Sequence, residues 1–91
     1  MAEVGPILVG SKTVASAGTA EALTDRTILC SAVVIKAKVG NSNPVFVVDT
    51  ATESKKFPMT AGDSITIPVN NPALISIDVT TNAEGVDWIA V

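Results

Sequence analysis

The strongest structural signal in this 91-residue chain is the alternation of apolar and polar residues across Asp63–Thr80. Every second residue is apolar from Ile65 to Val69, and the pattern resumes from Ile75 to Val79 after an Asn-Asn-Pro turn. A period of two with β-branched residues is typical of strands that have one face on a core and the other in water. We therefore predict two strands folded back on each other as a hairpin. Their polar faces would lie in solvent: Ser64, Thr66, Ser76 and Asp78.

Further strand candidates recur along the chain, each bounded by residues that favour turns. They cover Lys12–Ala17, Ala20–Thr24, Ile28–Lys38, Val45–Asp49, Phe57–Thr60 and Val86–Val91. No stretch keeps helical spacing for two turns. Seven to eight short strands predict an all-β fold, a single small β-sandwich of jelly-roll or immunoglobulin-like type. We assign the sandwich to residues 11–91 and an N-terminal arm to residues 1–10, because Gly5-Pro6 interrupts regular structure there.

The alternation also predicts which side chains fill the core. The expected core residues are Val33, Ile35, Ile65, Ile67, Ile75, Ile77 and Trp88. A tryptophan in an apolar final strand is typical of a large core residue, and its truncation to alanine would cost about 3–5 kcal/mol. The single cysteine, Cys30, lies in an apolar segment and is expected to behave as a small buried hydrophobe.

Hydrophobic residues make up 47% of the chain, which is high for a domain of this size. We infer that part of this apolar surface is covered by other chains. The candidate interface residues are Ile7, Leu8 and Val9 in the arm, together with Val34. The arm could instead form a first edge strand. Val34 is a candidate because it shares its strand face with Lys36 and Lys38.

The chain lacks the residue patterns that most catalytic and metal sites need. It contains no histidine, and no sequence pattern gives Cys30 a base, so an activated nucleophile is not expected. No Cys/His cluster, calcium loop or phosphate-binding loop occurs, so we expect no enzyme activity, no metal and no cofactor. The net charge of −3 and the scattered lysines argue against nucleic acid as a partner. No secretory signal or membrane span is expected, and one cysteine fits folding in a reducing cytoplasm.

Six short motifs in order resemble a known group of proteins. They are Val14–Ala20 (VASAGTA), Val33–Ala37 (VVIKA), Val45–Val47 (VFV), Ala61–Ile65 (AGDSI), Ile75–Val79 (ISIDV) and Gly85–Trp88 (GVDW). Together they are similar to small structural proteins of tailed-bacteriophage virions, and the resemblance covers most of the chain from Lys12 onward. Family members often carry tyrosine at the place of Phe46, followed by a glycine-rich segment, whereas Asp49–Lys56 here has no glycine.

The resemblance implies a non-enzymatic capsid decoration (cement) protein built as a β-sandwich. Such a protein would be made in the host cytoplasm and bind the outer surface of the head as a homo-oligomer, commonly a trimer. Its partners would be other copies of itself and the phage major capsid protein. Two alternatives stay open. One is a tail, neck or fibre-associated virion module. The other is a carbohydrate- or receptor-binding β-sandwich that uses Trp88 or the Asn-rich loop at residues 40–43.

Overall fold

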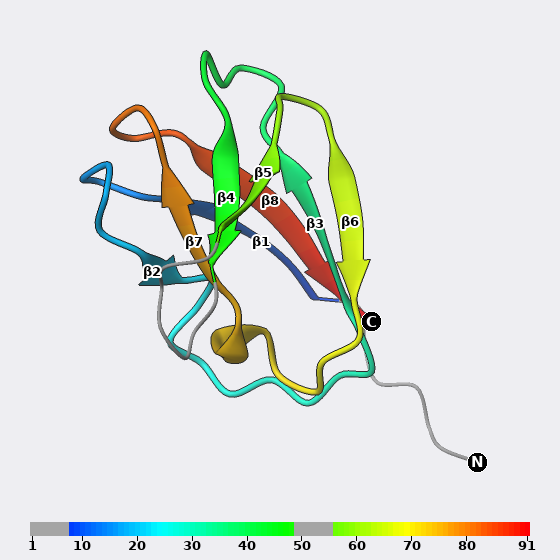
Figure 1. The fold of residues 1–91 in the computed structure, drawn as a ribbon. Helices are drawn as coiled ribbons and strands as arrows, with labels where there is room; N and C mark the ends of the chain where they lie inside the picture. Colours follow the sequence, from blue (N-terminus) through cyan, green and yellow to red (C-terminus); the bar gives the residue numbers. More distant parts are fainter. Residues whose placement is uncertain (1–7, 49–55) are drawn as a thin grey trace.

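A computed structural model, which describes residues 8–48 and 56–91, has two antiparallel four-stranded sheets facing each other (Figure 1). Sheet 1 has the strand order β1-β8-β3-β6, and sheet 2 has the order β2-β7-β4-β5. The strands of sheet 1 are β1 (Leu8–Thr13), β8 (Gly85–Ala90), β3 (Val33–Ala37) and β6 (Ser64–Ile67). Those of sheet 2 are β2 (Glu21–Ala22), β7 (Ser76–Val79), β4 (Val45–Val48) and β5 (Lys56–Met59). The predicted all-β sandwich is therefore confirmed.

The pairing of the strands identifies the type of sandwich. β1 pairs with β8, β2 with β7, β3 with β6 and β4 with β5, all antiparallel. This is one long hairpin of four strand pairs, wrapped so that alternate pairs fall in opposite sheets. An eight-stranded double sheet of this kind is a jelly roll, which decides between the two sandwich types that the sequence left open.

The core between the sheets is almost entirely aliphatic, and it follows the alternation along each strand. In β3, Val33, Ile35 and Ala37 are fully buried, and in β8 the buried residues include Val86, Trp88 and Ala90. From sheet 2 and from Ile75, the residue before β7, the core receives mainly Val45, Met59, Ile75, Ile77 and Val79. Ile65 and Ile67 of β6 are half-buried and pack against this cluster, because β6 is an edge strand.

The predicted hairpin across Asp63–Thr80 is wrong. β6 is an edge strand of sheet 1 and β7 an inner strand of sheet 2, so the two strands do not pair. A short 3₁₀ helix, η1 (Pro72–Leu74), carries the chain from one sheet to the other at the lower end of Figure 1. Asn71 caps this helix, with its side-chain oxygen accepting a hydrogen bond from Ala73 N–H at 3.1 Å. The alternation gave the core face of each strand correctly but not its partner.

The ends of the strands also differ from the sequence-based ranges. β1 begins at Leu8, so residues 8–10 of the expected arm lie in sheet 1, paired with β8. Residues 1–7 of that arm lie outside the described residues. So do residues 49–55, between β4 and β5. Only Val33–Ala37 of the expected long strand Ile28–Lys38 is a strand, because residues 28–32 cross the end of the sandwich and bond to Asn70, Asn71 and Val91.

Asp78 corrects the predicted solvent-exposed polar face of β7. Its side chain is only 3% exposed, and Oδ1 accepts hydrogen bonds from Gly18 N–H at 2.9 Å and Val79 N–H at 2.8 Å. Lys56 Nζ lies 3.1 Å from Oδ2. Asp78 therefore connects the β1–β2 loop, β7 and β5, which sequence alternation could not show because the loop's position depends on the tertiary fold.

Candidate interaction surface

The outer face of sheet 1 carries the most distinctive surface of the described residues. Alternation along β8 puts Asp87 and Ile89 on this face while their neighbours are buried. The strand register aligns Val9 of β1 with Ile89, and Ile89 with Val34 of β3. We call these three residues, Val9, Ile89 and Val34, the outer apolar row.

The outer apolar row crosses three adjacent strands. Val9 is 73% exposed, which is high for a valine in a strand, and Ile89 and Val34 are half-buried. The row lies along a shallow hollow of about 320 Å³ that is also lined by Lys36, Ser64, Asp87 and Trp88. Val91, 39% exposed, follows Ile89 on the same strand face and extends the apolar character toward one end.

The next rows of this face are polar and tied together by hydrogen bonds. Ser11 Oγ donates to Asp87 Oδ1 at 2.9 Å, and Lys38 Nζ lies 2.6 Å from Ser11 Oγ and 2.7 Å from Asp87 Oδ1. The hydrogen bond from Lys38 is the largest cause of a lowered pKa for Asp87, with a further contribution from Ser11. The outer face therefore combines an apolar half with a polar half, in which charged side chains are already hydrogen-bonded to one another.

The structure places only some of the candidate interface residues on the outer face of sheet 1. Val9 and Val34 share the outer apolar row, although they lie far apart in the sequence. Leu8 is on the opposite face of β1 and packs against the core. Ile7 lies outside the described residues. Ile89 was not among the candidates, yet its alternation with Trp88 would have placed it on the outer face.

Trp88 lies in the core and is not a surface anchor. It is 7% exposed, and its indole lies directly over Gly10, its register partner on β1. Its Nε1 is buried and has no hydrogen-bond partner among the described residues. An alanine Cβ at Gly10 would overlap the ring, so the glycine makes room for the tryptophan.

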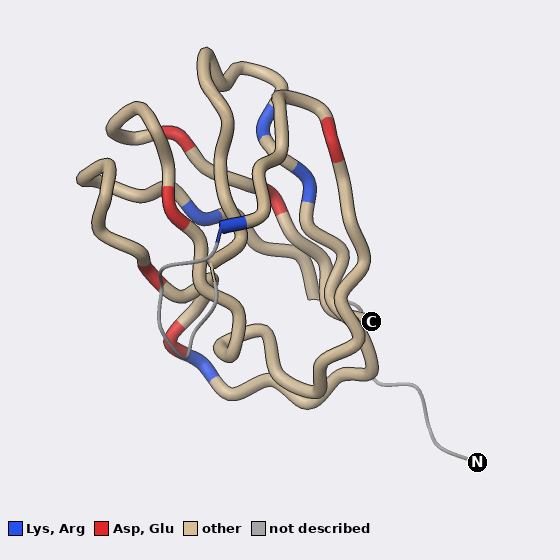
Figure 2. The backbone as a smooth tube through the Cα atoms, viewed as in Figure 1, with Lys and Arg blue, Asp and Glu red and all other residues tan. Residues whose placement is uncertain are grey.

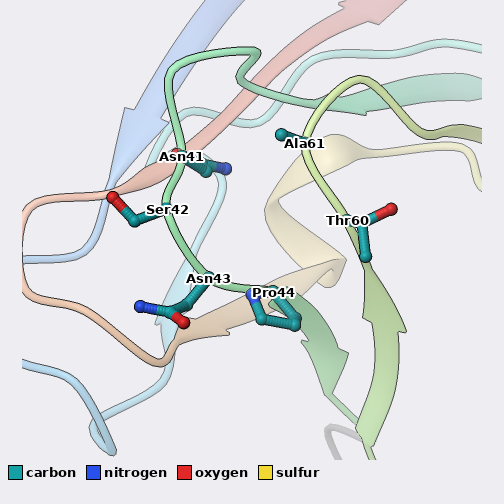
Figure 3. Close-up of a pocket in the computed structure, with 6 residues that line it drawn as sticks. All are labelled: Asn41, Ser42, Asn43, Pro44, Thr60 and Ala61. Atoms are coloured by element: carbon teal, nitrogen blue, oxygen red, sulfur yellow. The ribbon is translucent and has the colours of Figure 1, made fainter.

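The loops at the upper end of the sandwich form a second, smaller hollow of about 250 Å³ (Figure 3). It is lined by Asn41, Ser42, Asn43, Pro44, Thr60 and Ala61. Several of its polar groups already have partners. Asn41 Nδ2 donates to Gly85 C=O at 2.9 Å, Asn43 Nδ2 donates to Thr81 Oγ1 at 2.7 Å, and Ser42 N–H donates to Glu84 at 2.6 Å. Trp88 is not part of the lining, so the two features offered for sugar binding lie apart.

Charged residues are spread along the described part of the backbone (Figure 2). Within residues 8–48 and 56–91, no group of three or more His, Cys, Asp or Glu side chains is placed to hold a metal ion. Cys30 is half-buried, and its Sγ lies 3.2 Å from Val69 C=O. No described helix has the length and apolar character needed to cross a membrane.

Asp78 and Lys56 form the most buried ionic contact of the described residues. Burial raises the pKa of Asp78, but hydrogen bonds from Lys56, Val79 and Gly18, together with the charge of Lys56, outweigh it and lower the pKa overall. Lys56 Nζ also lies 5.3 Å from the centre of the Phe46 ring. These contacts hold the carboxylate ionised and fully bonded, which suits a structural role more than acid-base chemistry.

Comparison with known proteins gives no relative. No family model, no curated protein and no solved structure matches this chain.

Proposed function

We propose that this protein is a non-enzymatic structural component of a tailed-phage virion, a decoration protein that binds the outer surface of the head as an oligomer and stabilises it. The proposal rests on the sequence resemblance and on one observation, the outer apolar row next to a bonded polar network. The jelly roll is compatible with this role, since viral capsid proteins use this fold, but lectins use it too.

The outer face of sheet 1 supports a docking role because its apolar and polar halves would contribute to binding in different ways. Covering Val9, Ile89 and Val34 would remove apolar side chains from water. The network of Ser11, Lys38 and Asp87 is already bonded, so its groups need little rearrangement when a partner covers the rim. Apolar residues beside polar, hydrogen-bonded residues are found together in many protein interfaces.

The test is binding to expanded, undecorated heads of the phage that supplies the capsid, followed by pelleting and quantification of bound protein. Val9→Asp should weaken binding by roughly 10- to 100-fold, because burying a valine contributes about 1.5–3 kcal/mol. Val39→Asp is the matched control. Val39 is 75% exposed, nearly the same as Val9 at 73%, but it lies beyond β3 in the β3–β4 loop.

Two outcomes would contradict the proposal. One is that the unmodified protein fails to bind heads at any concentration. The other is that Val9→Asp and Val39→Asp bind equally well, which would remove the outer apolar row from the interface. Binding to isolated tails but not to heads would instead place the protein in a tail or neck module. Sedimentation of the free protein would report its oligomeric state.

A carbohydrate- or receptor-binding role is the second candidate, and only the hollow at the upper loops favours it. That hollow is small, and it contains none of the aromatic side chains on which sugars stack. A strong glycan-array signal that is lost in Asn43→Ala but kept in Val9→Asp would support this role over the virion role.

A further inference from the structure

Among residues 8–48 and 56–91, no strand pairs with the outer edge of β1 in sheet 1, and the other three sheet edges are short or contain or adjoin a proline. Edge strands expose unpaired N–H and C=O groups, and proteins usually shorten them or interrupt them with proline. β2 has only two residues, β5 contains Pro58, and β6 has four residues followed directly by Pro68. β1 has six residues and no proline.

The hydrogen bonds show which groups of β1 point to this free edge. Val14 N–H donates to Glu84 C=O at 3.0 Å, at the end of the β1·β8 ladder. Hydrogen-bonded residues alternate along an antiparallel pair, so the even-numbered residues of β1 bond to β8. The N–H and C=O groups of Val9, Ser11 and Thr13 therefore point away from the sheet. Among the described residues, none of these groups has a backbone partner outside β1·β8.

We propose that β1 pairs with β1 of a second copy of this chain, antiparallel and centred on Ser11, to join two sheets into one. In this register Ser11 lies opposite Ser11 of the second copy, and Val9 lies opposite its Thr13. Every outward group of Val9, Ser11 and Thr13 then gains a partner on both copies. The outer faces also stay aligned, since only residues of equal parity face each other.

A second copy fits this edge better than an unrelated strand. The outward groups are arranged symmetrically about Ser11, so two identical strands satisfy both edges at once and the contact closes on itself. Val9, 73% exposed in the single chain, would gain the β-branched Thr13 of the second copy as a neighbour. The proposal does not depend on the virion role.

Cysteine cross-linking tests both the contact and its register. In a Cys30→Ser background, which removes the only cysteine, Ser11→Cys should form a disulfide-linked dimer under mild oxidation. Directly opposite residues in a hydrogen-bonded pair have Cα atoms about 5.5 Å apart, within the range that a disulfide spans. Thr13→Cys alone should not cross-link, but a mixture of Val9→Cys and Thr13→Cys should give a covalent heterodimer.

Sedimentation of the unmodified protein provides a measurement that needs no variant. We expect a reversible dimer that is lost in Ser11→Pro, because proline removes the central outward N–H and leaves the backbone hydrogen bonds from β1 to β8 in place. A monomer up to millimolar concentration would overturn the proposal. So would equal cross-linking of Ser11→Cys and Thr13→Cys, or a trimer without the Ser11→Cys cross-link. A monomer that still binds heads would leave the virion proposal standing, and a dimer that ignores heads would leave only the β1 contact.

Discussion

The contact between Gly10 and Trp88 makes a sharp prediction about stability. An alanine Cβ at position 10 would overlap the Cζ2 and Cε2 atoms of the indole and lie 2.8 Å from Nε1. Ordinary carbon contacts are about 3.5–4.0 Å, so the ring or the edge strand must move by roughly 1 Å. Overpacking of this kind costs about 1–3 kcal/mol. Replacing glycine in a strand returns about 0.5–1 kcal/mol, so we expect Gly10→Ala to destabilise by about 1–2 kcal/mol.

The assay is urea unfolding followed by intrinsic fluorescence, which reports only Trp88 because the chain has one tryptophan and no tyrosine. In a thermal melt followed by the same signal, each kcal/mol should lower Tm by about 4–8 °C in a domain of this size. Gly40→Ala is the control, since a Cβ there meets nothing within 4 Å. It should be neutral or stabilising by up to about 1 kcal/mol.

A double-mutant cycle separates the steric cause from other effects of alanine. In a Trp88→Leu background the overlap disappears, so Gly10→Ala should become nearly neutral when unfolding is followed by circular dichroism. The reasoning is refuted if Gly10→Ala costs the same with and without Trp88, or if it behaves like Gly40→Ala.

Substitutions at three further positions address other contacts, each measured by chemical and thermal unfolding. Asp78→Asn should lower the free energy of unfolding by about 1–3 kcal/mol at neutral pH. This cost should shrink below about pH 4, because the lowered pKa of Asp78 stabilises the fold only while its carboxylate is ionised. A cost that does not depend on pH, or one equal to that of Asp25→Asn at an exposed site, would contradict this. Ala83→Gly should stabilise by about 0.5–1 kcal/mol, since Ala83 has φ 68°, whereas Ala83→Val should destabilise; equal effects would exclude backbone strain. Gly85→Ala should destabilise by more than about 3 kcal/mol, because its Cβ would overlap the backbone oxygen of Lys12; a folded variant of normal Tm would show that β1 can shift away.

The sequence could predict which face of a strand is buried, but not which strand lies beside it. Alternation in Val33–Ala37 correctly assigns the buried and outer positions, since it depends only on the two-residue period of a strand. The hairpin prediction failed because β6 and β7 both point apolar residues at the same core from opposite sheets. The alternation of apolar and polar residues is the same whether the two strands pair in one sheet or lie in opposite sheets. Only the tertiary fold decides between these arrangements.

The candidate surface was partly visible in the sequence for a similar reason. Val34 stands out as an apolar residue on a lysine-bearing face, and Val9 was suspected only as part of an apolar arm. Their alignment through Ile89 depends on the register of β8 between β1 and β3, which joins residues more than fifty positions apart. The prediction that Asp78 lies in solvent was wrong because the β1–β2 loop covers it. Nothing in the residues of that loop indicates that it packs over β7.

The place of β8 in sheet 1 has a consequence for the order of folding. β8 lies between β1 and β3, so the first strand has no partner in its own sheet until residues 85–90 have been synthesised. Pairing the first strand with the eighth closes a very long loop, and folds dominated by such non-local contacts fold in milliseconds to seconds. During translation, both edges of Leu8–Thr13 stay unpaired until β8 has been synthesised. The growing chain therefore passes through a state with two open edges on β1, more exposed to aggregation than the finished fold.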